Sequence, residues 1–173
     1  MKKKERIYLS LGTNLGDRLE NLRAAVSLID QRLSRPMALS SVYESEAWGY
    51  ESPHPFYNLC AGLEVSLEPL ELLGQLQRIE SDLGREKPAR HGDEEPKDRL
   101  IDIDLIFMGS RVLRLPQLRV PHPSMEERRF VLKPLKEIAP AFIHPVSGYT
   151  VSELLAKYGD QGTVRVTGTL THF

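Results

Sequence analysis

The chain is short of the features that mark several classes of protein. It has one cysteine, Cys60, so it cannot form an internal disulfide, and its formal charge is −1 over 173 residues. A single thiol is compatible with a reducing compartment, and a charge so close to zero provides no overall field that would attract nucleic acid. No apolar run is long enough to span a membrane. We therefore expect a cytoplasmic protein that binds neither nucleic acid nor membranes.

Several motifs of nucleotide and metal sites are also missing. The five histidines are scattered without the spacing of zinc ligands. Neither the Gly-x-x-x-x-Gly-Lys-Ser/Thr phosphate loop nor the Gly-x-Gly-x-x-Gly dinucleotide motif occurs. The lysines at 2–4 are followed by Glu5 and Arg6 and not by an apolar segment, so we expect no secretion signal.

The length predicts one domain over residues 1–173, with residues 159–173 as an additional tail. A composition of 40% hydrophobic and 27% charged residues is ordinary for a protein with one buried core. No long apolar stripe remains without a place in that core, so we expect a monomer.

One predicted strand carries two carboxylates where apolar residues are usual. Residues 99–108 read RLIDIDLIFM, and side chains two apart on a strand point to the same face. Asp102 and Asp104 should therefore share a face. The residues expected to continue that face are Leu100, Ile106 and Met108. A solvated face would not be apolar at both ends, although an exposed strand end with two solvated acids is the simpler alternative for an isolated Asp-x-Asp.

The two acids favour a metal and phosphate site. Carboxylates about 6 Å apart repel each other by roughly 3 kcal/mol at an effective dielectric near 20. A divalent cation between the two carboxylates would turn this repulsion into attraction, and Mg²⁺ prefers oxygen ligands. Arg99, three residues before Asp102, suggests that a phosphate lies nearby.

The remaining pattern predicts an α+β fold. Strands are expected over residues 7–11, 39–46, 56–65 and 99–108, and helices over 15–33 and 69–83. This order is that of a ferredoxin-like βαββαβ core, a mostly antiparallel sheet with helices on one face. An additional helix is expected from Met125 towards Ile138, with Ser124 as its cap and an interruption near Pro134. A short final helix is expected over 151–158, and a late strand over 163–170. The segments 48–55 and 85–98 have the Gly, Pro and charge content of loops.

With these elements placed, the chain resembles the 6-hydroxymethyl-7,8-dihydropterin pyrophosphokinase family over about residues 7–155. The most specific motif is Arg99-x-x-Asp102-x-Asp104. The supporting motifs are LGTNLG at 11–16, FYN at 56–58, QRIE at 77–80, VPHP at 120–123 and RRF at 128–130.

The resemblance implies transfer of diphosphate from ATP to the hydroxymethyl group of the pterin, with release of AMP, in folate biosynthesis. It implies two Mg²⁺ ions on Asp102 and Asp104, and catalytic roles for Arg85 and Arg99. The residues that it places on ATP are Gln77, Glu80, Arg85, Arg99, His122 and Arg128. The residues that it places on the pterin are Gly12, Thr13, Asn14, Ser45, Trp48, Phe56, Asn58 and Phe130.

Each of these residues also has an ordinary structural reading. A single arginine is as often a surface charge, a single Phe is more often core packing, and Gly-Thr-Asn also suits a plain turn between strand and helix. Gln77 and Glu80 would be exposed by helical spacing alone. At the level of function, the alternatives are another metal-dependent enzyme, such as a phosphohydrolase or nuclease, and a binding module without chemistry.

The chain departs from the family pattern at four places. Lys97 and Asp98 stand before Arg99, where a small residue followed by Pro, Ser, Ala or Glu is usual. Trp48 occupies a position that is often aliphatic, and Glu46 one where proline is common. The 85–98 loop has no tryptophan, and it contains the acidic run at 93–95.

Overall fold

The computed structural model describes residues 3–84, 98–158 and 163–170. The strands are β1 (Glu5–Thr13), β2 (Ala38–Leu39), β3 (Val42–Ser45), β4 (Phe56–Val65), β5 (Asp102–Met108), β6 (Leu113–Arg114), β7 (Arg119–Val120) and β8 (Val164–Gly168). The helices are α1 (Arg18–Arg32), α2 (Pro69–Asp82), α3 (Arg129–Ile138) and α4 (Val151–Lys157), with one 3₁₀ turn, η1 (Met125–Glu127).

Local chemistry explains where the helices begin. The side chain of Asp17 accepts the N–H of Glu20 at 3.1 Å and caps α1. Thr150 and Glu153 form a reciprocal capping box at the start of α4. In α2, Pro69 occupies the first turn, where a missing N–H costs no hydrogen bond.

Most predicted elements are confirmed, and β4 has the predicted bounds. Two of the predicted elements differ in the structure. The expected strand over 39–46 is divided into β2 and β3, which pair with separate parts of β4. The expected helix from Met125 towards Ile138 is a 3₁₀ turn followed by α3, and α3 continues through Pro134 where an interruption was expected. The short pair β6–β7 was not predicted.

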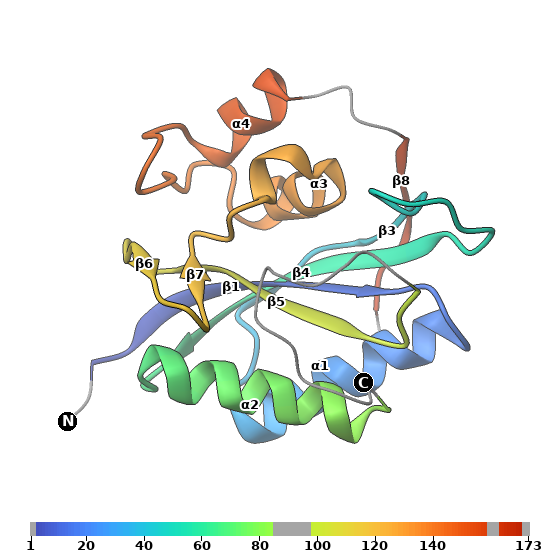
Figure 1. Cartoon of the computed structure of the whole chain (residues 1–173), viewed down its shortest axis with the longest axis horizontal. Helices are drawn as coiled ribbons and strands as arrows, with labels where there is room; N and C mark the ends of the chain where they lie inside the picture. The colour runs from blue at the N-terminus through green and yellow to red at the C-terminus, as the bar shows by residue number, and fades with distance from the viewer. Residues whose placement is uncertain (1–2, 85–97, 159–162, 171–173) are drawn as a thin grey trace.

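The main sheet is antiparallel, with strand order β5-β1-β4-β3-β8 and with β2 also paired to β4. The sheet separates two layers of helices. Figure 1 shows α1 and α2 on one face, below the sheet in this view, and α3 and α4 on the other. The prediction of helices on one face therefore holds for α1 and α2, and the C-terminal helices cover the opposite face.

Each face has its own apolar cluster. The α1/α2 face is built mainly on Ile7, Leu9, Leu11, Leu59, Leu63, Ile103, Leu105 and Met108. The α3/α4 face is built on Tyr8, Cys60, Ile106, Phe107, Val131, Leu135 and Leu154. Among the described residues, no helix combines the length and apolar character that crossing a membrane requires.

A bulge changes which residues of β5 share a face. The pairing between β1 and β5 shifts between Tyr8 and Leu9, so that Tyr8 lies opposite Phe107 and Leu9 opposite Leu105. The extra residue, Ile106, breaks the alternation. As a result Phe107 joins Ile106 on the α3/α4 face, and Met108 turns into the α1/α2 core.

The prediction that Met108 continues the aspartate face is therefore wrong. The prediction for Leu100 is wrong too, because Leu100 precedes β5 and is exposed. Only Ile106 of the three expected residues follows the aspartates on their face of the sheet.

Gly62 of β4 provides a test of the packing on the α3/α4 face. A Cβ at Gly62 would lie 2.9 Å from Cε1 of the buried Tyr8 ring. We expect Gly62→Ala to lower the free energy of unfolding by about 1–3 kcal/mol through overpacking. Gly74→Ala in α2, where nothing lies within 4 Å of the added Cβ, should instead raise it by about 0.5–1 kcal/mol. Urea unfolding measures both, and equal shifts would contradict this account.

Candidate active site

The two aspartates lie on the α3/α4 face, at the start of β5. In the register of the sheet, Asp102 is opposite Gly12 of β1, which is in turn opposite Asn58 of β4. A Cβ on Gly12 would approach Oδ1 of Asn58 to 3.3 Å. Glycine in the middle of this row therefore leaves space between the carboxylate and the amide. The adjacent row joins Asp104 to Ser10.

Glu80 fixes the backbone between the aspartates. Its carboxylate Oε2 accepts the N–H of Ile103 at 2.9 Å, and its side chain is buried on α2. Helical spacing alone had suggested an exposed residue. The contact gives Glu80 a role in holding β5, and Gln77, one turn earlier, is partly buried.

Two basic side chains face Asp104. Nε2 of His122 lies 3.8 Å from its Oδ2, and Nη1 of Arg128 lies 3.6 Å from the same oxygen. His122 is buried, and its Nδ1 accepts the N–H of Ser124 at 3.2 Å. Because Nδ1 is an acceptor, the proton of the neutral ring lies on Nε2, toward Asp104.

These groups fit a magnesium ion that is shared with a phosphate. Among the residues described, no group of three or more His, Cys, Asp or Glu side chains could hold a metal by itself. Mg²⁺ commonly binds through one or two carboxylates and completes its shell with substrate phosphates and water. Nε of Arg128 is buried and has no hydrogen-bond partner within the described parts of the chain. It is therefore a donor that an anion could satisfy.

Arg128 also contacts the aromatic part of the site. Its guanidinium carbon lies 5.1 Å from the ring centre of Trp48 and 5.8 Å from that of Phe130. A cavity of about 530 Å³ next to these rings is lined by Ser45, Trp48, Phe130, Tyr158 and Val164, among others. The structure thus brings three predicted pterin residues together at one cavity.

The other predicted pterin residues lie elsewhere on the sheet. Asn58 is buried and donates to Oγ of Ser45 at 2.8 Å, and like Phe56 it does not line this cavity. The side chain of Thr13 is buried and accepts from Nδ2 of Asn21 in α1 at 3.1 Å, so it is not directed at the aspartates.

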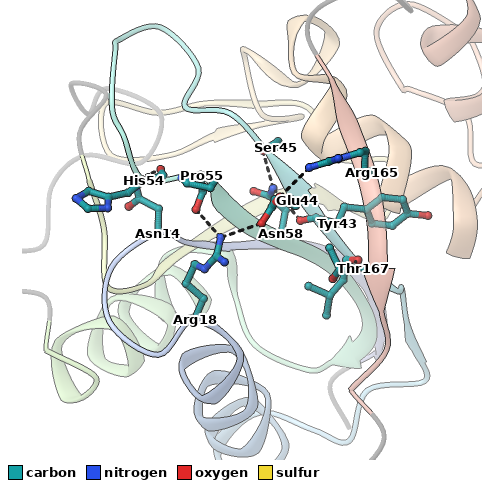
Figure 2. A network of polar contacts seen from close by, with 11 residues as sticks. Asn14, Arg18, Tyr43, Glu44, Ser45, His54, Pro55, Asn58, Arg165 and Thr167 are labelled. Carbon is teal, nitrogen blue, oxygen red and sulfur yellow. Dashed lines mark hydrogen bonds and ion pairs between the residues drawn. The ribbon is translucent and has the colours of Figure 1, made fainter.

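Asn14 connects three segments of the chain. Its Nδ2 donates to the carbonyl of His54 at 3.0 Å and to the carboxylate of Asp98 at 2.8 Å, and its Oδ1 accepts the N–H of Arg99 at 2.6 Å. Figure 2 shows Asn14 beside His54, at the base of the loop between β3 and β4. Arg99 itself is buried.

Arg85 lies outside the described residues. In the described part of the chain, the sequence reasoning missed the group around Asp98, to which Tyr50 and Ser52 donate hydrogen bonds. The available signal was that Asp98 departs from the family pattern just before Arg99.

Comparison with known proteins identifies the family. The model of the family "7,8-dihydro-6-hydroxymethylpterin-pyrophosphokinase (HPPK)" matches residues 8–140. A 2-amino-4-hydroxy-6-hydroxymethyldihydropteridine pyrophosphokinase of Porphyromonas gingivalis is 44% identical over 140 residues, which cover 80% of this chain and 93% of the relative. The enzyme of that name from Aquifex aeolicus is 39% identical, with 81% and 84% covered.

A solved structure has the same fold. The Plasmodium falciparum HPPK-DHPS structure with pteroate aligns with a TM-score of 0.72 at 16% identity, over 91% of this chain. This chain spans 45% of that longer protein.

The contact between Glu80 and Ile103 provides a test of how β5 is held. Glu80→Ala would leave the N–H of Ile103 without this acceptor, and we expect a loss of about 1–3 kcal/mol in the free energy of unfolding. Glu80→Gln, which keeps an oxygen acceptor, should lose clearly less. Urea unfolding of the two variants makes the comparison, and equal losses would mean that this hydrogen bond contributes little.

Proposed function

This chain belongs to the 7,8-dihydro-6-hydroxymethylpterin-pyrophosphokinase family, and we propose that it transfers diphosphate from ATP to 6-hydroxymethyl-7,8-dihydropterin at the sheet face that carries Asp102 and Asp104. In this reaction of folate synthesis, the hydroxymethyl group releases its hydroxyl proton to solvent and its oxygen bonds to the β-phosphorus of ATP. The bond from that phosphorus to the oxygen of the α-phosphate breaks, and AMP leaves.

One observation carries the placement of the reaction. Asp104 and the basic side chains of His122 and Arg128 meet at one end of β5, and Arg128 also contacts the aromatic rings at the neighbouring cavity. Carboxylates that suit a metal ion, basic side chains that suit a phosphate and aromatic rings that suit a flat conjugated substrate are thus adjacent. Phosphoryl transfer requires mainly positioning and charge neutralisation from the protein.

Each residue has a proposed role in that arrangement. Asp102 and Asp104 hold two Mg²⁺ ions, which when bound supply charge neutralisation and orientation of the phosphates. Arg128 and His122 bind phosphate oxygens, and a guanidinium suits this because its planar fork can donate two parallel hydrogen bonds. Arg85 and Arg99 are proposed to stabilise the charge that develops during transfer. Gln77 and Glu80 are proposed on the nucleotide side.

The pterin is proposed to lie against aromatic faces. Phe130 and Trp48 line the cavity of about 530 Å³ together with Ser45. Phe56 and Asn58 are proposed to contact the ring from β4, and Gly12, Thr13 and Asn14 to form the edge of the site at the end of β1. The N–H groups and amides at the ring edge would provide specificity, and the rings would provide contact area.

We also propose the topology of the fold, the oligomeric state and the cellular compartment. The order β5-β1-β4-β3, with α1 and α2 on one face, suits a ferredoxin-like βαββαβ core. We propose a single domain over residues 1–173 that acts as a monomer in the cytoplasm. The buried free thiol of Cys60 is compatible with a reducing compartment.

The aspartates provide the main test. We expect Asp102→Asn and Asp104→Asn each to lower kcat by roughly 10²–10³-fold, since each removes charge that the metal–phosphate group needs. Asp30→Asn, at an exposed position of α1, is the matched control and should keep full activity. The assay follows AMP and pterin diphosphate together by chromatography, and circular dichroism checks that the variants fold.

Three results would contradict the proposal. ADP as the product would mean transfer of one phosphoryl group. Hydrolysis of ATP at full rate without pterin would favour a phosphohydrolase. Loss of folded structure in both aspartate variants would make the pair structural.

Phe130 tests the pterin side separately. Phe130→Ala should weaken pterin binding by about 0.5–1.5 kcal/mol beyond its lost contact area, because it removes a ring from the cavity wall. ATP binding should change much less. Isothermal titration with pterin and with a non-hydrolysable ATP analogue in the presence of Mg²⁺ compares the two, and equal losses would remove Phe130 from the pterin site.

A further inference from the structure

The loop between β3 and β4, residues 46–55, carries Trp48 and forms part of the cavity wall. We call it the 46–55 loop. The end of the loop next to β4 is held by hydrogen bonds to two backbone carbonyls. Asn14 donates to the carbonyl of His54, and Arg18 donates to the carbonyl of Pro55 at 2.9 Å. Figure 2 shows both donors reaching the same end of the loop, Asn14 from the turn after β1 and Arg18 from the start of α1. The guanidinium of Arg18 also lies 3.7 Å from the ring centre of Tyr57.

Asp98 fastens the middle of the same loop. Its Oδ1 accepts hydrogen bonds from Oγ of Ser52 at 2.7 Å, Nδ2 of Asn14 at 2.8 Å and the hydroxyl of Tyr50 at 2.9 Å. Ser52, Asn14 and Tyr50 are separated from Asp98 by 46, 84 and 48 residues of sequence, respectively. None of these contacts therefore follows from local structure. One carboxylate oxygen thus joins the loop to the end of β1.

The same point of the chain leads directly into the aspartate strand. The N–H of Arg99 donates to Oδ1 of Asn14, and its carbonyl accepts the N–H groups of Asn14 and Leu15 at 2.9 and 3.1 Å. Residues 98–99 are therefore held at four points to the end of β1. The position of the 46–55 loop and the entry into β5 are set by one cluster, which we call the Asp98 cluster: Asn14, Tyr50, Ser52, Asp98 and Arg99.

The charge of Asp98 strengthens the cluster at neutral pH. Hydrogen bonds from Ser52, Asn14 and Tyr50 lower the pKa of Asp98, and the nearby His54 acts in the same direction. Burial and the hydrogen bond to Asp98 raise the pKa of Tyr50 to about 12, so its hydroxyl remains a donor. Hydrogen bonds to an ionised acceptor are stronger than those between neutral groups.

We propose that Asp98 is a positioning residue that sets the 46–55 loop, and with it Trp48, against the strand that carries Asp102 and Asp104. It acts through the loop and through the backbone of Arg99. Without the carboxylate of Asp98 the loop would keep its anchors at His54 and Pro55 but lose the one at its middle. With the pterin in this cavity, on which the inference rests as part of the proposed function, the cavity wall would then become ordered only when substrate binds, which costs affinity.

The single tryptophan of the chain provides a direct readout. Because Trp48 lies in the loop, its fluorescence reports loop position without turnover, whether or not the proposed pterin site is correct. We expect Asp98→Ala to increase quenching of Trp48 by acrylamide and to raise the KM for pterin on the order of tenfold, the equivalent of one charged hydrogen bond. The KM for ATP should change much less.

Three further variants separate charge, geometry and simple stability. Asp98→Asn keeps an oxygen acceptor without the charge and should lie between Asp98→Ala and the parent chain in both readouts. Tyr50→Phe should raise the KM for pterin by only a fewfold, and it should add little to Asp98→Ala, because the two changes remove the same contact. Glu51→Gln, an exposed acid in the same loop, is the matched control and should leave both readouts unchanged.

The outcomes distinguish this proposal from the proposed function. If Asp98→Ala lowers the unfolding midpoint but leaves Trp48 quenching and the ratio of the two KM values unchanged, Asp98 is only structural and the proposal is overturned. If quenching rises while the KM for pterin stays constant, the loop is positioned by Asp98 but does not border the pterin, which overturns the link to the reaction. Equal increases in both KM values with unchanged quenching also overturn it.

Discussion

The register of β1 between β4 and β5 is the constraint on which the site depends. Gly12 pairs with Asp102 on one side and with Asn58 on the other. Hydrogen bonds between main chains therefore decide that these side chains from distant parts of the sequence share a row. A slip of one residue would turn both carboxylates of β5 into the apolar layer under α1 and α2. The burial of Ile103 and Leu105 in that layer opposes such a slip, so the stability of the core also fixes the position of the acids.

The two faces of the sheet have different tasks in this arrangement. The sheet face that packs against α1 and α2 is a continuous apolar core, whereas the other face is apolar only toward the Ile106 end of β5. The bulge at Ile106 increases this division, because it places Phe107 as well as Ile106 in the α3/α4 core, beyond Asp104 on the same strand. Glu80 reaches β5 from α2, and its carboxylate accepts a hydrogen bond from the N–H of Ile103. The polar end of β5 is thus anchored from the apolar layer.

The sequence predicted the repeating patterns and missed the irregular contacts. Alternation along residues 99–108 correctly placed Asp102 and Asp104 on one face, and the apolar run at 56–65 predicted β4 with its bounds. The assignment of Met108 to the aspartate face was wrong, because a bulge depends on the partner strand and leaves no local pattern. The contacts of Asp98 with Tyr50 and Ser52 could not be derived either, since they join segments that only the tertiary fold brings together.

Two separate links connect the 46–55 loop to the segment that carries Asp102 and Asp104. In the first, Asp98 holds Tyr50 and Ser52 next to the entry into β5. In the second, the guanidinium of Arg128 contacts both Asp104 and the ring of Trp48. If Arg128 binds a phosphate as proposed, part of its attraction for Asp104 would pass to that phosphate, so this link would change on binding. The side-chain partners of Asp98 are the neutral donors of Ser52, Asn14 and Tyr50, none of which is proposed to bind a phosphate, so this link can persist through the reaction. A wall held by one constant and one exchangeable contact stays ordered while the charges beside it are redistributed.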